Sequence, residues 1–301
     1  MRILTYDVPA CYDGVPVKSF LRGPCGLSAR MLVRLKRTAN GLTVNGRPVR
    51  AVDRLHAGEC LVVSLPDETP ATLPSDIDVP VLYEDEDLLV FDKPPGMPVH
   101  PCPGCPGGAL SNAARRRQLE RGESWTFRPL YRLDRDTTGA VTVAKHAHAA
   151  ALLSRAVQKT YFAVCEGLLA EPGVIDLPIR LKPGHSVERE TGEGGQAAVT
   201  HYEPLARGGG HTLLRLRLET GRTHQIRVHL SALGHPLAGD DLYGGGRSGI
   251  ARQALHCGRI CFDQPFSGKR VAVSSPLPED FCLLLAGLGV DPAAAEEAPG
   301  F

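Results

Sequence analysis

The stretch "TLLRLRLETGRTHQIRVHL", residues 212–230, changes its hydrophobic period in the middle. In its first half, Leu214, Leu216 and Leu218 alternate with Arg215 and Arg217. A period of two predicts a strand with one buried face, and the arginines predict a basic outer face.

The second half of the same stretch has the period of a helix. A helix is predicted to begin near Thr223, with Ile226, Leu230 and Leu233 as its buried stripe. His224 and Arg227 then lie together on another face. A strand that passes through the Gly221 turn into a helix indicates a domain built from both kinds of element.

Strand signals dominate the chain on both sides of this stretch. Further strands are predicted at "LLVFDK" (88–93), "GAVTVAK" (139–145), "TYFAVCEG" (160–167) and "AAVTHYEPLA" (197–206). Helices are few, so the expected class is α+β, with residues 81–290 forming a mostly antiparallel mixed sheet with flanking helices and loops. The last residues, 291–301, are predicted to be a disordered tail.

Residues 1–65 are predicted to form a separate small α/β module. "SARMLVRLKRTANG" (28–41) has a serine N-cap, helical spacing and a stop at Asn40 and Gly41; "LTVNGRPV" contains an Asn45-Gly46 hairpin turn, and "CLVVSL" (60–65) is a short strand. This order of elements resembles the small RNA-binding domain shared by one small-subunit ribosomal protein and many RNA-modifying enzymes. "PDETPATLPSDIDVP" (66–80), rich in proline and acids, is the predicted linker.

Charge is distributed unevenly although the formal net charge is only +1. Residues 1–65 carry ten Lys/Arg against four Asp/Glu, whereas residues 66–92 carry nine acids and no base. Arg30, Arg34 and Arg37 recur at helical spacing as a basic stripe, which fits either a solvated helix face or contact with a polyanion.

Composition places the chain among soluble enzymes. With 301 residues and 43% hydrophobic content it can bury a sizeable core, and no apolar run approaches the roughly 18 residues of a membrane helix. We expect a cytoplasmic protein, monomeric by default. Its nine cysteines, an odd number, are expected to be free thiols.

Two other segments carry tempting side chains. "HPCPGCPGG" (100–108) contains His100, Cys102 and Cys105, but a tetrahedral zinc site needs a fourth ligand, so we predict a loop and no metal. "SNAARRRQLERGE" (111–123) is a helix whose three successive arginines span nearly a full turn, which predicts a solvated face rather than one ligand site.

The stretch "RPLYRLDRDTTGAVTVAK" (128–145) holds Asp134 and Asp136 among three arginines. A carboxylate that stays ionised in a dry pocket needs a cation at hydrogen-bond distance, and Arg227 could supply it. Either aspartate could instead form a structural ion pair that caps the Thr-Thr-Gly turn, and the shape of the motif leaves that open.

Several segments, in consistent order, resemble the RluA family of RNA pseudouridine synthases. They are "YEDEDLLVFDKPPGMPVHP", "RLDRDTTG" (132–139), "KTYFAVCEG" (159–167), "TGRTHQIRVHLSALGHPLAGDDLYGG", "ALHCGRICFDQPF" and "SSPLPEDF", covering roughly residues 80–282. The resemblance implies an enzyme that isomerises uridine to pseudouridine in structured RNA, with ribosomal RNA favoured over tRNA.

By position, the resemblance implies that Asp134 is the catalytic aspartate, Arg227 the residue that neutralises it, and Tyr161 the active-site tyrosine; Asp136 would be structural. Arg132 lies where the family places an arginine against the RNA. The other expected RNA contacts are Arg22, Arg30, Arg34, Arg37, Lys159, Arg222 and His224. One departure is Tyr131, where the family often has histidine, and this bears on RNA contacts and target choice.

The implied reaction moves a glycosidic bond within one nucleotide, so no cofactor, nucleotide or metal is expected. Two other functions remain. A non-catalytic ribosome-assembly factor could keep the basic module but would not need Asp134, Tyr161 and Arg227 together. A nucleobase-releasing glycosidase would need a second carboxylate paired with Asp134, and none is clearly placed.

Overall fold

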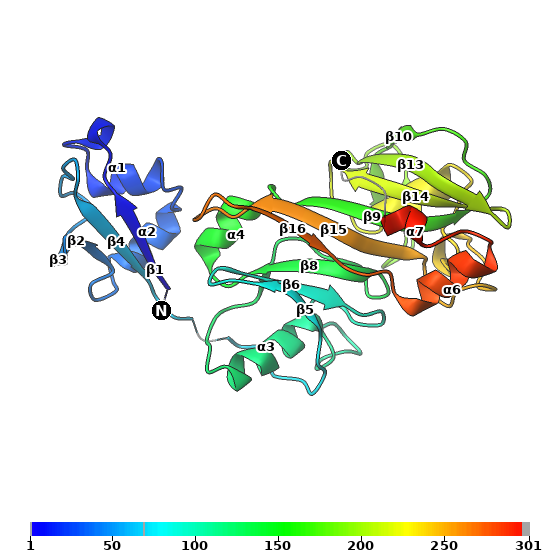
Figure 1. Ribbon diagram of the computed structural model, residues 1–301, viewed down its shortest axis with the longest axis horizontal. Helices are drawn as coiled ribbons and strands as arrows, with labels where there is room; N and C mark the ends of the chain where they lie inside the picture. The colour runs from blue at the N-terminus through cyan, green and yellow to red at the C-terminus, as the bar shows by residue number, and fades with distance from the viewer. Residues whose placement is uncertain (1, 69, 297–301) are drawn as a thin grey trace.

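The computed structural model describes residues 2–68 and 70–296, which form a four-stranded sheet, a ten-stranded sheet and a two-stranded hairpin (Figure 1). The α+β class with a mostly antiparallel mixed sheet is confirmed. None of the helices in the described ranges has the length and apolar character that crossing a membrane requires.

The N-terminal part has an antiparallel four-stranded sheet in the order β1-β4-β2-β3. Its elements are β1 Arg2–Asp7, the 3-10 turn Ala10–Tyr12, α1 Val17–Arg22, α2 Ala29–Leu35, β2 Leu42–Val44, β3 Arg47–Pro48 and β4 Cys60–Leu65. Both helices contribute buried apolar side chains, among them Phe20, Leu32 and Leu35, to a core distinct from that of the large sheet.

Local signals of this part are confirmed with one difference in length. The Ser28 hydroxyl caps α2 by accepting the Met31 N–H at 3.1 Å, and the Asn45-Gly46 turn joins β2 to β3. However, α2 ends at Leu35 rather than at Asn40, because the chain tightens into turns there: the Thr38 N–H bonds the Leu35 carbonyl at 3.1 Å.

The large sheet contains ten strands in the order β10-β13-β14-β9-β15-β8-β6-β5, with β16 added beside β15 and β7 beside β8. Its strands are β5 Val81–Glu84, β6 Leu88–Lys93, β7 Arg128–Pro129, β8 Thr138–Ala144, β9 Gln158–Glu166, β10 Gly173–Asp176, β13 Val199–Gly208, β14 His211–Leu218, β15 Leu255–Asp263 and β16 Arg270–Ser274. Every pairing is antiparallel except that of β8 with β15.

Helices and a hairpin flank this sheet. They are α3 Leu110–Glu120, α4 Ala147–Leu153, the hairpin of β11 Ile179–Leu181 with β12 Arg189–Thr191, α5 Gln225–Ala232, the 3-10 turn Asp241–Tyr243, α6 Glu279–Gly287 and α7 Ala293–Glu296. In Figure 1, α3 lies below β5 and β6, α4 lies at the end nearest the N-terminal part, and α6 and α7 lie at the opposite end.

Of the two arginines expected on a basic outer face of β14, Arg217 is partly exposed but Arg215 is buried. Leu214 and Leu216 are fully buried in the main core as expected, but Leu213 on the other face packs against Phe281 and Leu284 of α6. Because α6 covers that face, Arg215 is only 6% exposed, and it pairs with Glu203 on β13.

Two further expectations need correction at the ends of elements. Leu233, assigned to the buried stripe of α5, is 40% exposed at the end of the helix, whereas Ile226 and Leu230 are buried. The expected disordered tail begins in an ordered segment, because α7 spans Ala293–Glu296 and Ala295 is fully buried; residues 297–301 lie outside the described residues.

The parallel contact of β8 and β15 fixes where the long loop before β8 emerges. Gly139 on β8 pairs with Cys257 on β15 and with Lys93 at the end of β6. A Cβ at Gly139, whose φ is +110°, would lie 2.3 Å from the Cys257 carbonyl oxygen. Glycine therefore permits the close approach that gathers three strands beside residues 130–137.

Candidate active site

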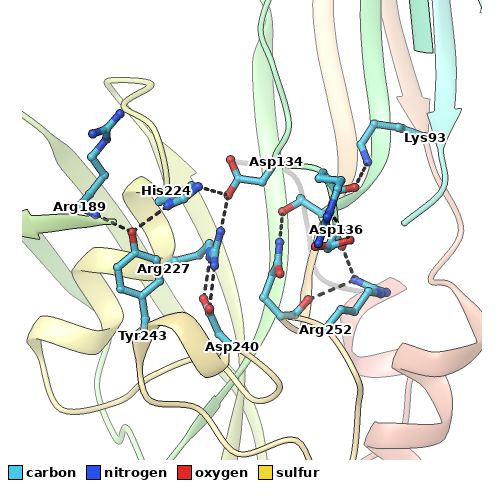
Figure 2. A network of polar contacts seen from close by, with 12 residues as sticks. Lys93, Asp134, Asp136, Arg189, His224, Arg227, Asp240, Tyr243 and Arg252 are labelled. Carbon is cyan, nitrogen blue, oxygen red and sulfur yellow. Dashed lines mark hydrogen bonds and ion pairs between the residues drawn. The ribbon is translucent and has the colours of Figure 1, made fainter. Parts of the chain in front are cut away.

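The loop before β8 is tied down from two sides by its backbone. The Lys93 ammonium donates to the Arg135 carbonyl at 2.8 Å, and the Arg252 guanidinium donates to the Asp136 carbonyl at 3.2 Å (Figure 2). Within the loop, the Thr137 N–H bonds the Asp134 carbonyl at 3.1 Å. These contacts fix the backbone on which Asp134 is carried.

Lys93 is almost wholly buried, with 1% of its surface exposed. Its other two protons go to the carbonyl oxygens of Pro94 and Met97, both at 2.9 Å. Burial lowers the pKa of Lys93 to about 7, and the nearby carboxylates of Asp136 and Asp134 oppose that shift. The lysine thus joins the turn after β6 to the loop that carries Asp134.

The two aspartates of the loop have different surroundings. The Asp134 side chain is 25% exposed, and its Oδ2 lies 3.2 Å from Nη1 of Arg227. The Asp136 carboxylate pairs instead with its neighbour Arg135, at 3.0 Å. Only Asp134 lines the large cleft described below. The geometry therefore favours Asp134 for contact with a substrate and leaves Asp136 in a local ion pair.

Arg227 is held more tightly by a second carboxylate. Its Nε and Nη2 form two bonds with Asp240, at 2.6 and 2.8 Å, and its guanidinium lies 4.9 Å from the centre of the Tyr243 ring. Burial works against the charge, but the bonds to Asp240 and the charges of Asp240 and Asp134 raise the pKa of Arg227 above its usual value. The cation facing Asp134 is permanent and fixed in direction.

His224 completes the network behind Asp134. Its Nε2 lies 3.9 Å from Oδ2 of Asp134, and its Nδ1 lies 2.8 Å from the Tyr243 hydroxyl, which accepts the Arg189 backbone N–H at 2.9 Å (Figure 2). Burial lowers the pKa of His224, with the charge of Arg227 adding to the shift. We assign a neutral ring that accepts at Nδ1, so that the Nε2 proton faces Asp134.

His224 reaches this place through an unusual backbone conformation. It precedes the first residue of α5 with φ 58° and ψ 19°, in the left-handed region, where histidine is tolerated better than most residues. This turn directs the imidazole toward the loop of Asp134, while Arg227 follows one turn later in the helix.

A cleft of about 1140 Å³ opens in front of Asp134. Of the residues expected from the sequence, it is lined by Arg132, Asp134, Lys159, Tyr161 and Arg222. Arg227 and His224 stand behind Asp134 through the contacts above. Seven of the side chains expected from the sequence to act in the site therefore lie in one region of the fold.

Two tyrosines are among the residues that line the cleft. Tyr161 on β9 is 5% exposed, and burial raises its pKa well above the usual value. Tyr131 sends its hydroxyl to the Ala140 carbonyl at 2.9 Å, and the Lys159 ammonium lies 4.8 Å from the centre of its ring. Arg132 also lines the cleft and is exposed.

The arginines expected on the N-terminal part lie elsewhere. Arg22, Arg30 and Arg37 are exposed on this separate part of the chain and do not line the cleft. Arg34 pairs with Glu68 at 2.6 Å, and Glu68 also binds Arg128 on β7. Through Glu68, Arg34 therefore helps to join the two parts of the chain. The expectation that it stands in an open basic stripe needs correction.

The two remaining candidate segments differ in place, because His100 and Cys102 line the large cleft whereas the arginines of α3 do not. Within residues 2–68 and 70–296, no three His, Cys, Asp or Glu side chains gather as possible metal ligands. Cys102 and Cys105 face each other across a tight turn, with the Cys105 N–H bonding the Cys102 carbonyl at 2.8 Å. The arginines of α3 go to separate partners, such as Glu120 for Arg116 and Glu84 for Arg117.

Sequence reasoning missed Asp240, Tyr243, Lys93 and Arg252 as parts of this region. Asp240 and Tyr243 stand in "LAGDDLYGG", and a signal was present there, since an acid in a glycine-rich loop after the helix can fold back onto an arginine of that helix. Lys93 stands in a proline and glycine turn, and no pattern reveals that its ammonium is buried.

Known proteins resemble the chain over most of its length. A family model described as RNA pseudouridylate synthase matches residues 87–232. The chain is 39% identical to the RNA pseudouridine synthase YjbO of Bacillus subtilis, over 88% of this chain and 96% of that one. It is 41% identical to the ribosomal large subunit pseudouridine synthase D of Pseudomonas aeruginosa, over 83% and 84%.

Solved structures agree with these sequence matches. The human protein RNA pseudouridylate synthase domain containing 4 aligns with a TM-score of 0.56 and 27% identity, over 69% of this chain and 92% of that chain. The human domain containing 1 protein aligns with a TM-score of 0.55 and 29% identity, over 67% and 84%.

Proposed function

The chain belongs to the RNA pseudouridylate synthase family, and we propose on that premise that Asp134 is its catalytic carboxylate and large-subunit ribosomal RNA its substrate. The enzyme is a pseudouridine synthase, an isomerase. The observation that carries the assignment of Asp134 is its position on the cleft wall, where its carboxylate lies 3.2 Å from the guanidinium of the buried Arg227.

An ionised carboxylate under the ribose suits the first step, cleavage of the bond between the sugar and the base nitrogen. Asp134 could attack the anomeric carbon, attack the base, or remove the 2′ proton of the sugar. Arg227 has the same part in all three routes, because it holds the carboxylate oxygen in one direction and stabilises its negative charge.

The freed uracil must remain in the cleft and rotate before carbon 5 bonds to the sugar. Tyr161 offers a buried ring beside Asp134 on which the base can stack. Its hydroxyl is kept protonated by burial, since its pKa is raised, so it suits a hydrogen-bond donor better than a base.

The target nucleotide must leave its helix to enter the cleft. Arg132 is exposed at the cleft, where its planar guanidinium can occupy the space that the flipped base vacates. Lys159 and Arg222 add positive charge to the same walls, which suits the phosphates on either side of that nucleotide.

The choice of ribosomal RNA rests on the relatives. The similar protein of Pseudomonas aeruginosa is named for the large ribosomal subunit. We further propose that residues 1–65 form an RNA-binding domain, joined by residues 66–80 to the catalytic domain at 81–290. The exposed Arg22, Arg30 and Arg37 support that assignment.

The test incubates the protein with unmodified large-subunit rRNA, small-subunit rRNA and bulk tRNA, and maps pseudouridines by carbodiimide-dependent stops of reverse transcription. We expect new stops in the large-subunit rRNA with the wild-type protein and none with Asp134→Asn. Stops confined to tRNA would overturn the substrate, and stops that persist with Asp134→Asn would overturn the catalytic role.

A further inference from the structure

A second cavity, of about 370 Å³, lies beside the turn that joins β14 to α5. The β11–β12 hairpin forms one wall with Arg180 and Arg189, and the turn forms the other with Arg222 and Thr223. Arg222 and Thr223 also line the large cleft. The two hollows therefore adjoin, and a polymer bound in the cleft can continue into the second cavity.

The charge of this cavity is positive and mostly unbalanced. Arg180 is neutralised by Glu190 across the hairpin, at 2.8 Å. Among the residues that the structure describes, no carboxylate pairs with Arg189 or with Arg222; the latter only donates its Nε to the Ala197 carbonyl at 2.9 Å. Two guanidinium groups thus face a hollow with hydrogen-bond donors to spare.

Arg189 connects this cavity to the network behind Asp134. Its backbone N–H bonds the Tyr243 hydroxyl, while its side chain extends away from the tyrosine (Figure 2). The backbone of Arg189 therefore belongs to the network behind Asp134, while its side chain lines the second cavity. A change confined to the side chain can remove the charge from the cavity and leave the bond to Tyr243 in place.

Two glycines in the lining let a ligand come close to the backbone. Gly194 and Gly195 both line the cavity; a Cβ at Gly194 would meet no other atom within 4 Å, whereas Gly195 lies against the backbone of Ile179. An anion can therefore approach from solvent without displacing a side chain.

We propose that this cavity binds one backbone phosphate of the RNA substrate, next to the nucleotide that enters the cleft. Arg189 and Arg222 supply charge-assisted hydrogen bonds to the phosphate oxygens, which guanidinium groups match in geometry. The proposal rests on the proposed function in one respect: it takes RNA to be the substrate that binds in the adjoining cleft.

The experiment measures binding, so it does not depend on turnover. The full chain with Arg189→Ala and Arg222→Ala is compared with wild type in filter binding to a large-subunit rRNA transcript, from 50 to 300 mM KCl. Loss of one phosphate contact should raise Kd about tenfold and lower the slope of log K against log salt by roughly 0.7–0.9. Replacement of both arginines by lysine should restore the slope, since the charge returns.

Arg116→Ala is the matched control, because it removes a guanidinium on α3 that lines neither cavity. It should leave both Kd and slope unchanged.

A double alanine variant that melts like wild type but binds with the same Kd and slope would overturn the phosphate site. The proposal would also be overturned if the alanine variant lost binding and the double lysine variant did not restore the slope of log K against log salt. That result would indicate a structural role for the two arginines. If wild type binds the transcript but forms no pseudouridine, the proposed function fails while the comparison of slopes still decides this cavity.

Discussion

At the scale of single residues, the central feature is an arginine shared by two unequal carboxylates. Asp240 is 1% exposed and takes two bonds from Arg227, whereas Asp134 is a quarter exposed and takes one. The buried carboxylate fixes the arginine, and the arginine then presents one N–H to the accessible carboxylate. Asp134 is thereby held without being shielded from the cleft.

Replacing Asp240 by asparagine should damage both stability and catalysis. Arg227 would remain buried with only Asp134 to balance it, and an incompletely paired buried charge costs about 3 kcal/mol. The neighbouring substitution Asp241→Asn breaks an exposed pair with Arg247 and should change stability by less than about 1 kcal/mol. Urea unfolding at pH 7 measures the free energy of unfolding of both variants. Equal losses of stability in the two would contradict this account.

Residue identity alone could nominate Asp134, Tyr161 and Arg227, because each stands in a motif of several ordered segments. It could not reveal that Arg227 divides its bonds between two acids, or that His224 faces Asp134. Both facts depend on a left-handed turn at His224 and on a loop that brings Asp240, thirteen residues after Arg227, back to that arginine, and neither feature has a periodic pattern.

At the scale of elements, the sequence predicted the strands better than their surroundings. The runs at 88–93, 160–167 and 212–218 are strands β6, β9 and β14. The prediction failed for Arg215 because period two shows only that one face is apolar. That the other face is covered by α6, almost seventy residues later, is a property of the whole chain.

The close approach of β8 and β15 can be tested by adding one methyl group. Gly139→Ala should destabilise the fold by about 3 kcal/mol, since its Cβ would lie 2.3 Å from the Cys257 carbonyl oxygen at a φ unfavourable for alanine. Gly287→Ala, in α6 with no atom within 4 Å of the new Cβ, should be neutral or stabilise by about 0.5 kcal/mol. Thermal melts of the two variants should shift apart, and similar melting temperatures would contradict the close contact.

At the scale of the whole molecule, the N-terminal part meets the large sheet through polar and aromatic contacts. Glu68 binds Arg34 on one side and Arg128 on the other, and Arg128 stands directly before the loop of Asp134. Phe266 packs against both cores, next to His146 and His148. The junction therefore lies close to the strand that leads into the active site.

His148 at this junction gives stability a definite dependence on pH. It is 2% exposed, neither ring nitrogen has a hydrogen-bond partner within residues 2–68 and 70–296, and burial lowers its pKa to about 4. Between pH 6.5 and 4, His148 binds a proton in the unfolded chain but stays neutral in the folded chain. The stability that is present above pH 6.5 is therefore lost as the pH falls.

His148→Leu should therefore stabilise the protein by about 1–2 kcal/mol at pH 7, because two unsatisfied polar atoms are removed. It should also reduce the loss of stability between pH 7 and 5, although His256, whose pKa burial likewise lowers to about 4, still contributes. His146→Leu is the contrasting variant, since it breaks a 2.9 Å bond to buried Asp87 and should destabilise. Urea unfolding at both pH values measures these changes, and a destabilised His148→Leu would contradict the account.

The most direct test compares the two aspartates of one loop. Single-turnover rates of pseudouridine formation are measured on a large-subunit rRNA transcript for Asp134→Asn and Asp136→Asn. Asp134→Asn should lose at least about a thousandfold, equivalent to about 4 kcal/mol in the barrier, because its carboxylate faces the cleft. Asp136→Asn should stay within about tenfold of wild type, since its carboxylate forms an ion pair with its neighbour Arg135 and does not line the cleft. A fully active Asp134→Asn, or an inactive Asp136→Asn that still folds and binds RNA, would contradict the assignment.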